Sequence, residues 1–215
     1  MLGSRGFWVV IGSWNVAKHQ FGGPWTDDKL QRIRKYLTAY TTIFRGNVRA
    51  QYFRTTYVDA FAGTGTRTDS AQPHEPEIAS LFDLTADSEA KSLKDGSARI
   101  ALGVDPPFDH YVLVEQHAER AAELESLRTQ FPARDIRVEL AEANAFLRSW
   151  CSGTDWKRNR AVVFLDPDGM QVEWRTIKVI ADTKAIDLWW LVPLGIGMNR
   201  LLTSGGPPHA DGLMH

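Results

Sequence analysis

Short apolar stretches alternate with helical patterns along most of this chain. One of them, Ala161-Val162-Val163-Phe164-Leu165, contains no polar residue. A short run that is apolar throughout is typical of a strand in the centre of a parallel sheet, where both faces are buried. Strands that alternate with helices predict an open, doubly wound, mostly parallel α/β sheet. This alternation constrains the fold more than any other feature of the sequence.

The periodicity places the elements. Leu30, Ile33 and Leu37 recur at helical spacing after Thr26, a good N-cap residue. We expect helices at 26–44, 117–131, 143–150 and 173–182, and another helical stretch beginning near Ser97. We expect strands at 56–61, 111–115, 136–140, 161–165 and 185–192. Residues 66–95 are interpreted as a long polar excursion.

A chain of 215 residues that is 43% hydrophobic can bury one sizeable core. We expect an amino-terminal extension (1–25), one α/β domain (26–202) and an irregular tail (203–215). No strand is predicted after Val192, so the sheet is expected to lack its last strands, in a truncated or divergent chain. Its open edge would be covered by Phe7–Ile11 or by a partner chain.

Composition narrows the cellular setting. No apolar run approaches the roughly 18 residues that a membrane span needs. Cys151 is the single cysteine, which excludes an internal disulfide. The six histidines have no metal-ligand spacing, so no metal is predicted. These features predict a cytoplasmic protein that does not associate with a membrane.

Charge is distributed unevenly along the chain. Residues 18–67 carry a net charge of +6, and residues 68–145 carry −9, although the whole chain has a net charge of −1. A basic amino-terminal face can attract a polyanion such as nucleic acid. The same pattern also fits a solvated helix face that offsets an acidic neighbour, and the sequence leaves both interpretations open.

Polar residues follow the predicted strands at their carboxyl ends. Asp59, Glu115 and Asp166 close or follow the first, second and fourth strands, and Glu142 and Asn144 follow the third. Ligands of open α/β sheets bind beyond this edge. A buried carboxylate is costly unless something pairs with it. The placement therefore predicts a polar ligand at this edge.

The turn Gly63-Thr64-Gly65 narrows the class of ligand. A dinucleotide fingerprint needs a third glycine, where this chain has Thr68, and a helix that begins directly after the turn. S-adenosylmethionine contains no phosphate, so it does not need that helix N-terminus. Glycine at 63 and 65 lets the backbone approach its methionine part closely. The turn therefore favours S-adenosylmethionine and a sheet of the S-adenosylmethionine-dependent methyltransferase (Rossmann-like) type.

The residues around the turn then take distinct roles. Glu115 would accept both ribose hydroxyls, and Glu142 or Asn144 would meet the adenine edge. Asp59 would lie near the cationic end of the cofactor, and Phe61 is assigned to the same segment. We therefore expect S-adenosylmethionine to be held by Asp59, Phe61, Gly63, Gly65, Glu115 and Asn144.

The segment Asp166-Pro167-Asp168-Gly169 follows the most apolar strand. Its position matches the acidic-Pro element with which many nucleic-acid amino-methyltransferases line the substrate pocket. Asp166 and Pro167 are therefore the candidate catalytic residues, since a carboxylate and a backbone carbonyl can orient a target amine. Asp168 stands where that element usually has an aromatic residue. A ring that stacks on the base would therefore come from elsewhere, for example from Trp174, unless that ring is simply part of the core.

Several motifs together resemble the three-Cys-motif partner protein family (TcmP). They are Trp25–Leu30, Tyr36–Tyr40, Asp59–Gly65, Gly96–Ala98, Phe164–Pro167, Leu191–Pro193 and Asn199–Leu202. The resemblance implies a bacterial protein with a methyltransferase-like fold, often encoded beside a radical-SAM-like protein that carries three cysteines. The chain departs from the family at Glu142 and Asp168, where family members tend to have Asp and an aromatic residue.

Three functional hypotheses follow. The first is a methyltransferase-like protein acting on nucleic acid, with Arg200 and the basic segment Lys29–Lys35 contacting phosphates. The second is a non-catalytic partner module for the cysteine-motif protein. The third is a phosphodiester-cleaving enzyme in which Asp59, Glu115 and Asp166 hold Mg²⁺, a cation that prefers carboxylates.

Overall fold

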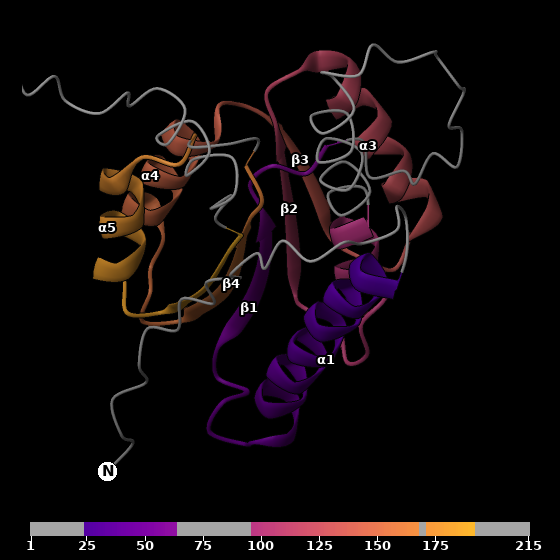
Figure 1. Ribbon diagram of the computed structural model, residues 1–215. Coiled ribbons are helices and arrows are strands. Elements are labelled where there is room, and N and C mark those ends of the chain that lie inside the picture. The colour runs from indigo at the N-terminus through magenta and orange to yellow at the C-terminus, as the bar shows by residue number, and fades with distance from the viewer. Residues whose placement is uncertain (1–23, 64–95, 168–170, 192–215) are drawn as a thin grey trace, which may run out of the picture.

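A parallel sheet of five strands forms the centre of the protein (Figure 1). The computed structural model describes residues 24–63, 96–167 and 171–191, with side chains from residue 30 onward. The strands are β1 (Arg54–Asp59), β2 (His110–Glu115), β3 (Ile136–Leu140), β4 (Asn159–Leu165) and β5 (Ile186–Trp190). Their spatial order is β3-β2-β1-β4-β5, and every neighbouring pair is parallel. The predicted fold class, a doubly wound α/β sheet with parallel strands, is confirmed.

Helices cover both faces of this sheet. They are α1 (Pro24–Gly46), α3 (Ala118–Gln130), α4 (Ala143–Gly153) and α5 (Trp174–Asp182), and residues 96–102 are also helical. One apolar cluster joins α1, residues 96–102 and α3 to one face. A second cluster joins α4 and α5 to the other face. Figure 1 shows these two layers on opposite sides of the strands.

The central strands are buried on both sides because they are apolar at successive positions. Tyr57 belongs to the cluster beneath α1, whereas its neighbour Val58 belongs to the cluster beneath α4 and α5, and neither has exposed surface. Side chains alternate between the faces of a strand, so each face receives its own set. Trp189 and Trp190 follow the same rule and pack on opposite faces of the sheet.

The predicted elements all lie in the expected order, and the differences are at their ends. β1 begins at Arg54 and ends at Asp59, so Ala60 and Phe61 belong to the turn that follows rather than to the strand. β5 is also shorter than predicted. The polar excursion at 66–95, the tail and the Phe7–Ile11 stretch lie outside the described residues. Among the described helices, none has the length and apolar character to cross a bilayer.

Candidate functional site

A cleft opens at the carboxyl ends of β1, β2 and β3. It encloses about 650 Å³ of space between atoms, part of which is open to solvent. Its walls come from three strand ends, from Arg120 in α3 and from Gln171. The lining residues are Ala60, Phe61, Gly63, Val114, Glu115, Gln116, Arg120, Ala141, Glu142, Ala143 and Gln171. The cleft therefore lies at the sheet edge where open α/β sheets bind their ligands.

Glu115 presents a carboxylate at the centre of these strand ends. The residue is 6% exposed, and it lines the cleft. Its Oε1 accepts the backbone N–H of His117 at 2.9 Å, which fixes the orientation of the side chain. Among the described residues Oε2 has no hydrogen-bond donor. This second oxygen can therefore accept a donor from a molecule in the cleft.

The turn after β1 brings backbone close to the same space. Gly63 has a φ of 62°, in the left-handed region where a side chain would be strained. The N–H of Ala62 donates to the carbonyl of Val114 at 3.1 Å, which attaches the turn to β2. Phe61 and Gly63 both line the cleft, as Glu115 does. Gly65 lies outside the described residues.

Asp59 lies beneath this turn and is fully buried. Its Oδ2 accepts the hydroxyl of Ser97 at 2.6 Å, and its Oδ1 accepts the N–H of Phe61 at 3.3 Å. Burial and then the charge of Asp59 raise the pKa of Tyr57 well above its ordinary value. Asp59 is not among the residues that line the cleft. Its position is that of a support for the turn, which differs from the predicted contact with the cationic end of a cofactor.

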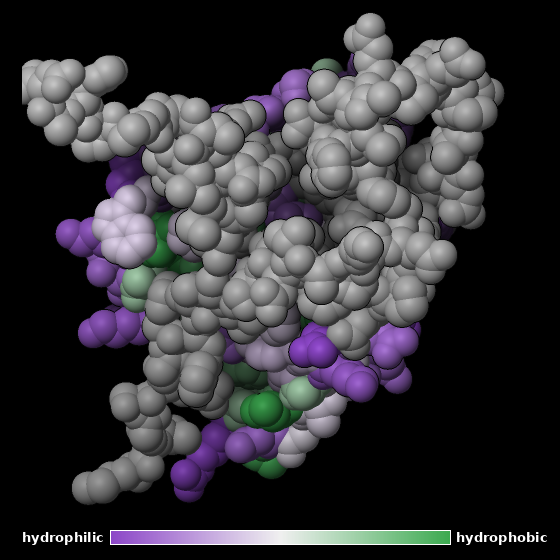
Figure 2. Space-filling view, in the orientation of Figure 1, coloured by the Kyte–Doolittle hydropathy of each residue, from purple (hydrophilic) through white to green (hydrophobic). Residues whose placement is uncertain are grey.

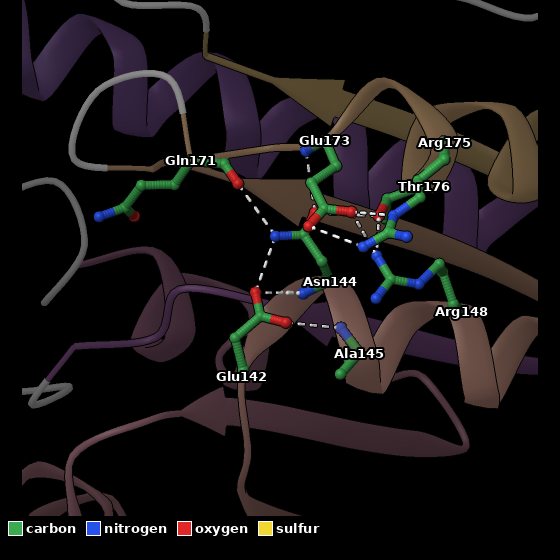
Figure 3. Close-up of polar contacts among 8 residues, drawn as sticks. All are labelled: Glu142, Asn144, Ala145, Arg148, Gln171, Glu173, Arg175 and Thr176. Carbon is green, nitrogen blue, oxygen red and sulfur yellow. Dashed lines mark hydrogen bonds and ion pairs between the residues drawn. The ribbon is translucent and has the colours of Figure 1, made fainter.

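Asn144 ties the wall of the cleft to the segment before α5 (Figure 3). Its Nδ2 donates to Oε1 of Glu142 at 2.7 Å and to the carbonyl of Gln171 at 2.9 Å. Its Oδ1 accepts the N–H of Glu173 and the hydroxyl of Thr176, both at 2.9 Å. Two donors and two lone pairs are the full capacity of an amide, so none remains for an adenine edge in this arrangement.

Glu142 caps the amino terminus of α4. Its carboxylate accepts the N–H of Asn144 at 2.8 Å and the N–H of Ala145 at 2.7 Å. Burial acts to raise the pKa of Glu142, but these N–H bonds outweigh it and hold the pKa below its ordinary value. Glu142 therefore stays ionised as a cap while it also lines the cleft.

Asp166 and Pro167 follow β4, which is the strand that pairs with β1. Asp166 is 7% exposed, its charge contributes to the raised pKa of Tyr57, and it is not among the residues that line the cleft. Asp168 lies outside the described residues. Among the residues that the structure describes, no three His, Cys, Asp or Glu side chains form a group that could hold a metal ion. Asp59, Glu115 and Asp166 thus share one sheet edge without forming a Mg²⁺ site.

Three polar residues of the cleft were missed from the sequence: Gln116, Arg120 and Gln171. Arg120 lies in the first turn of α3, and the first turn of a helix that follows a strand faces the carboxyl edge of the sheet. That rule was available from the predicted element order. Trp174 is 75% exposed, so the interpretation of this ring as core is wrong.

The strand order and the cleft together define a Rossmann-like α/β protein. No family model and no curated protein sequence matches the chain. A proposed methyltransferase of Escherichia coli, yhhF, has a similar structure, with 17% identity, a TM-score of 0.34, and coverage of 75% of this chain and 63% of that one. Protein LPL1258 of Legionella pneumophila, assigned to DUF519, is also similar in structure, with 18% identity and a TM-score of 0.43. The match covers 75% of this chain and 62% of that one. The chain thus spans less than two thirds of each of these proteins.

Proposed function

We propose that this chain is a methyltransferase-like protein that binds S-adenosylmethionine in the cleft and acts on nucleic acid. The observation that carries the proposal is Glu115, a nearly buried carboxylate with one oxygen still able to accept a hydrogen bond. A ribose offers two neighbouring hydroxyl donors, which suits such a group. A nearly buried carboxylate of this kind would otherwise lack a full set of partners.

The other lining residues fit the same ligand. The backbone at Gly63 would approach the methionine part, and Phe61 would give the turn an apolar wall. When bound, S-adenosylmethionine supplies an electrophilic methyl group.

The acceptor side is proposed to depend on Asp166 and Pro167. A carboxylate and a backbone carbonyl at the end of β4 can accept hydrogen bonds from an amine and orient its lone pair. Because Asp166 is 7% exposed, it would act from beneath the surface of the site. The resemblance of the sequence to the TcmP family supports the methyltransferase-like assignment. The nucleic-acid substrate is a further part of our proposal.

Calorimetric titration tests the cofactor part of the proposal. We expect S-adenosylmethionine and S-adenosylhomocysteine to bind the wild-type chain with a stoichiometry of one. Absence of binding at millimolar ligand would remove the enzyme hypothesis. Transfer of a labelled methyl group to a mixture of oligonucleotides then tests the acceptor.

A partner module for a radical-SAM-like three-cysteine protein is the second candidate. The specific observation in its favour is Trp174, which is 75% exposed at the first residue of α5. A large exposed aromatic ring is typical of an interface residue. This candidate predicts co-purification with that cysteine-motif protein, loss of the complex in Trp174→Ala, and no binding of S-adenosylmethionine.

A further inference from the structure

A basic and aromatic surface lies at the amino ends of β1 and β4, opposite the end of the sheet that carries the cleft. We call it the basic edge surface and define it by Arg49, Tyr52, Arg54, Lys157 and Arg158, all of them exposed. Two chain segments form it: the turn between α1 and β1, at the lower end of Figure 1, and the residues that lead into β4. The N–H of Arg54 donates to the carbonyl of Arg158 at 2.9 Å, so the two segments lie side by side.

Tyr52 is held at the centre of this surface. Its ring is 57% exposed, and its hydroxyl accepts a hydrogen bond from Nε of Arg158 at 3.1 Å. The guanidinium of Arg158 also lies 5.4 Å from the centre of the Tyr52 ring. The neighbouring Phe53 is covered by the guanidinium of Arg160 at 3.8 Å, which anchors the turn. An exposed ring that is already oriented can stack on a planar ligand at a low entropic cost.

The positive charges here are poorly compensated. Within the described part of the chain, the side chains of Arg49, Arg54 and Lys157 have no ionic or hydrogen-bonded partner. Two acids lie close to this surface: Asp155, which accepts the N–H of Lys157 at 3.0 Å, and Asp109, which accepts the N–H of Thr55 at 2.7 Å. By contrast, Arg45 at the end of α1 is neutralised by Asp109 at 2.8 Å. In the space-filling view, hydrophilic and apolar side chains adjoin one another at this lower end (Figure 2).

We propose that the basic edge surface binds single-stranded nucleic acid, with phosphates on its cations and a base stacked on Tyr52. An acidic peptide would use the cations but not the ring, so nucleic acid accounts for more of what is present. The inference deepens the proposed function and rests on its nucleic-acid part. A nucleic-acid strand bound here would have to run the length of β4, which is seven residues or about 23 Å, to reach the end of the sheet that carries the cleft.

Fluorescence anisotropy tests the cations. The probe is a labelled single-stranded oligonucleotide of roughly 20 nucleotides. We expect Arg49→Glu with Arg54→Glu to weaken binding by about tenfold or more, and to reduce the slope of log affinity against log salt by about 1.4. The control is Arg128→Glu with Lys178→Glu, which makes the same change in net charge on α3 and α5. Equal losses in the two double variants would overturn the proposal.

The ring is tested by Tyr52→Ala and Tyr52→Phe. Phenylalanine keeps the stacking face and loses only the bond to Arg158, so we expect it to retain most of the affinity that alanine loses. If both variants bind as the wild type does, or if polyglutamate displaces the oligonucleotide at equal charge concentration, the surface is not a nucleic-acid site. The assay contains no S-adenosylmethionine, and calorimetry with that compound is run on the same variants. Failure of one measurement is therefore distinguishable from failure of the other.

Discussion

The hydroxyl of Ser97 donates a 2.6 Å hydrogen bond to Oδ2 of Asp59, and both residues are fully buried. The bond joins the helical residues 96–102 to the carboxyl end of β1, directly beneath the turn that lines the cleft. Since Oδ1 of Asp59 also accepts the N–H of Phe61, the same carboxylate orients the first residues of that turn. A buried carboxylate at a sheet edge thus acts here through backbone that it positions.

Ser97→Ala should destabilise the protein by about 1.5–3 kcal/mol, because a buried hydrogen bond to a carboxylate is lost. Urea unfolding measures the change. The matched control is Thr42→Ala, which removes an exposed hydroxyl bonded to the carbonyl of Thr38, and which should change the free energy of unfolding by less than about 0.5 kcal/mol. Equal stability of the two variants would contradict the role given to Ser97.

Glu115→Gln should lower the affinity for S-adenosylmethionine by about tenfold while changing the free energy of unfolding little. The amide oxygen of glutamine can still accept the N–H of His117, but the charge and one acceptor oxygen are lost. Calorimetric titration measures the affinity. Glu119→Gln, an exposed residue in the first turn of α3, is the control. An unchanged affinity in Glu115→Gln would remove this carboxylate from the site.

The order of the elements and the edge that carries the cleft were predictable from the sequence. Apolar runs such as Ala161–Leu165 fix the strands, and the strand ends then place Phe61, Gly63 and Glu115 at one edge, where the structure has them lining one cleft. These inferences succeed because they depend on the burial of backbone and side chains along a single element.

The roles of Asp59 and Asn144 could not be predicted in the same way. Each is committed by partners distant in the sequence, Ser97 for Asp59 and Thr176 for Asn144. A polar residue at a strand end can either face a ligand or support a turn, and only the packed neighbours decide which. The sequence left Trp174 open between a stacking ring and a core ring for a related reason, and the helix that it begins buries Ile177 and Ile180 instead.

Cys151 should be unreactive in the folded protein. Its thiol is 4% exposed, and burial raises its pKa to about 12. At about pH 8 roughly one thiol in ten thousand would be ionised, and the thiolate is the nucleophile. We expect a disulfide reagent to modify Cys151 at a rate that follows unfolding and rises with urea. Rapid modification without denaturant, at the rate of a free thiol, would contradict the burial of this residue.

Asn144→Ala should cost about 2–4 kcal/mol, because it leaves the buried partners Thr176 and the N–H of Glu173 without their acceptor. The segment before α5 would then separate from α4, so hydrogen exchange should increase at the first turn of α5. Ser152→Ala removes an exposed hydroxyl from α4 and serves as the control. A loss of stability in Asn144→Ala without faster hydrogen exchange at α5 would show that the contact between α4 and the segment before α5 is not what stabilises the protein.

Glu142→Gln should make stability less dependent on pH. The folded pKa of Glu142 lies below its ordinary value, so its stabilising contribution is complete above the unfolded pKa and is lost as pH falls from about 4.5 through the folded pKa. Glutamine cannot titrate, and its amide nitrogen would face the N–H of Ala145, so the variant should be less stable by about 1 kcal/mol at neutral pH. Urea unfolding of both proteins between about pH 7 and pH 3 measures the difference.

The carboxyl groups of Asp109 and Glu173 also have lowered pKa values, but they are present in both proteins and cancel. With Glu125→Gln as an exposed control, a difference that stays constant across this range would show that the Glu142 charge does not stabilise α4.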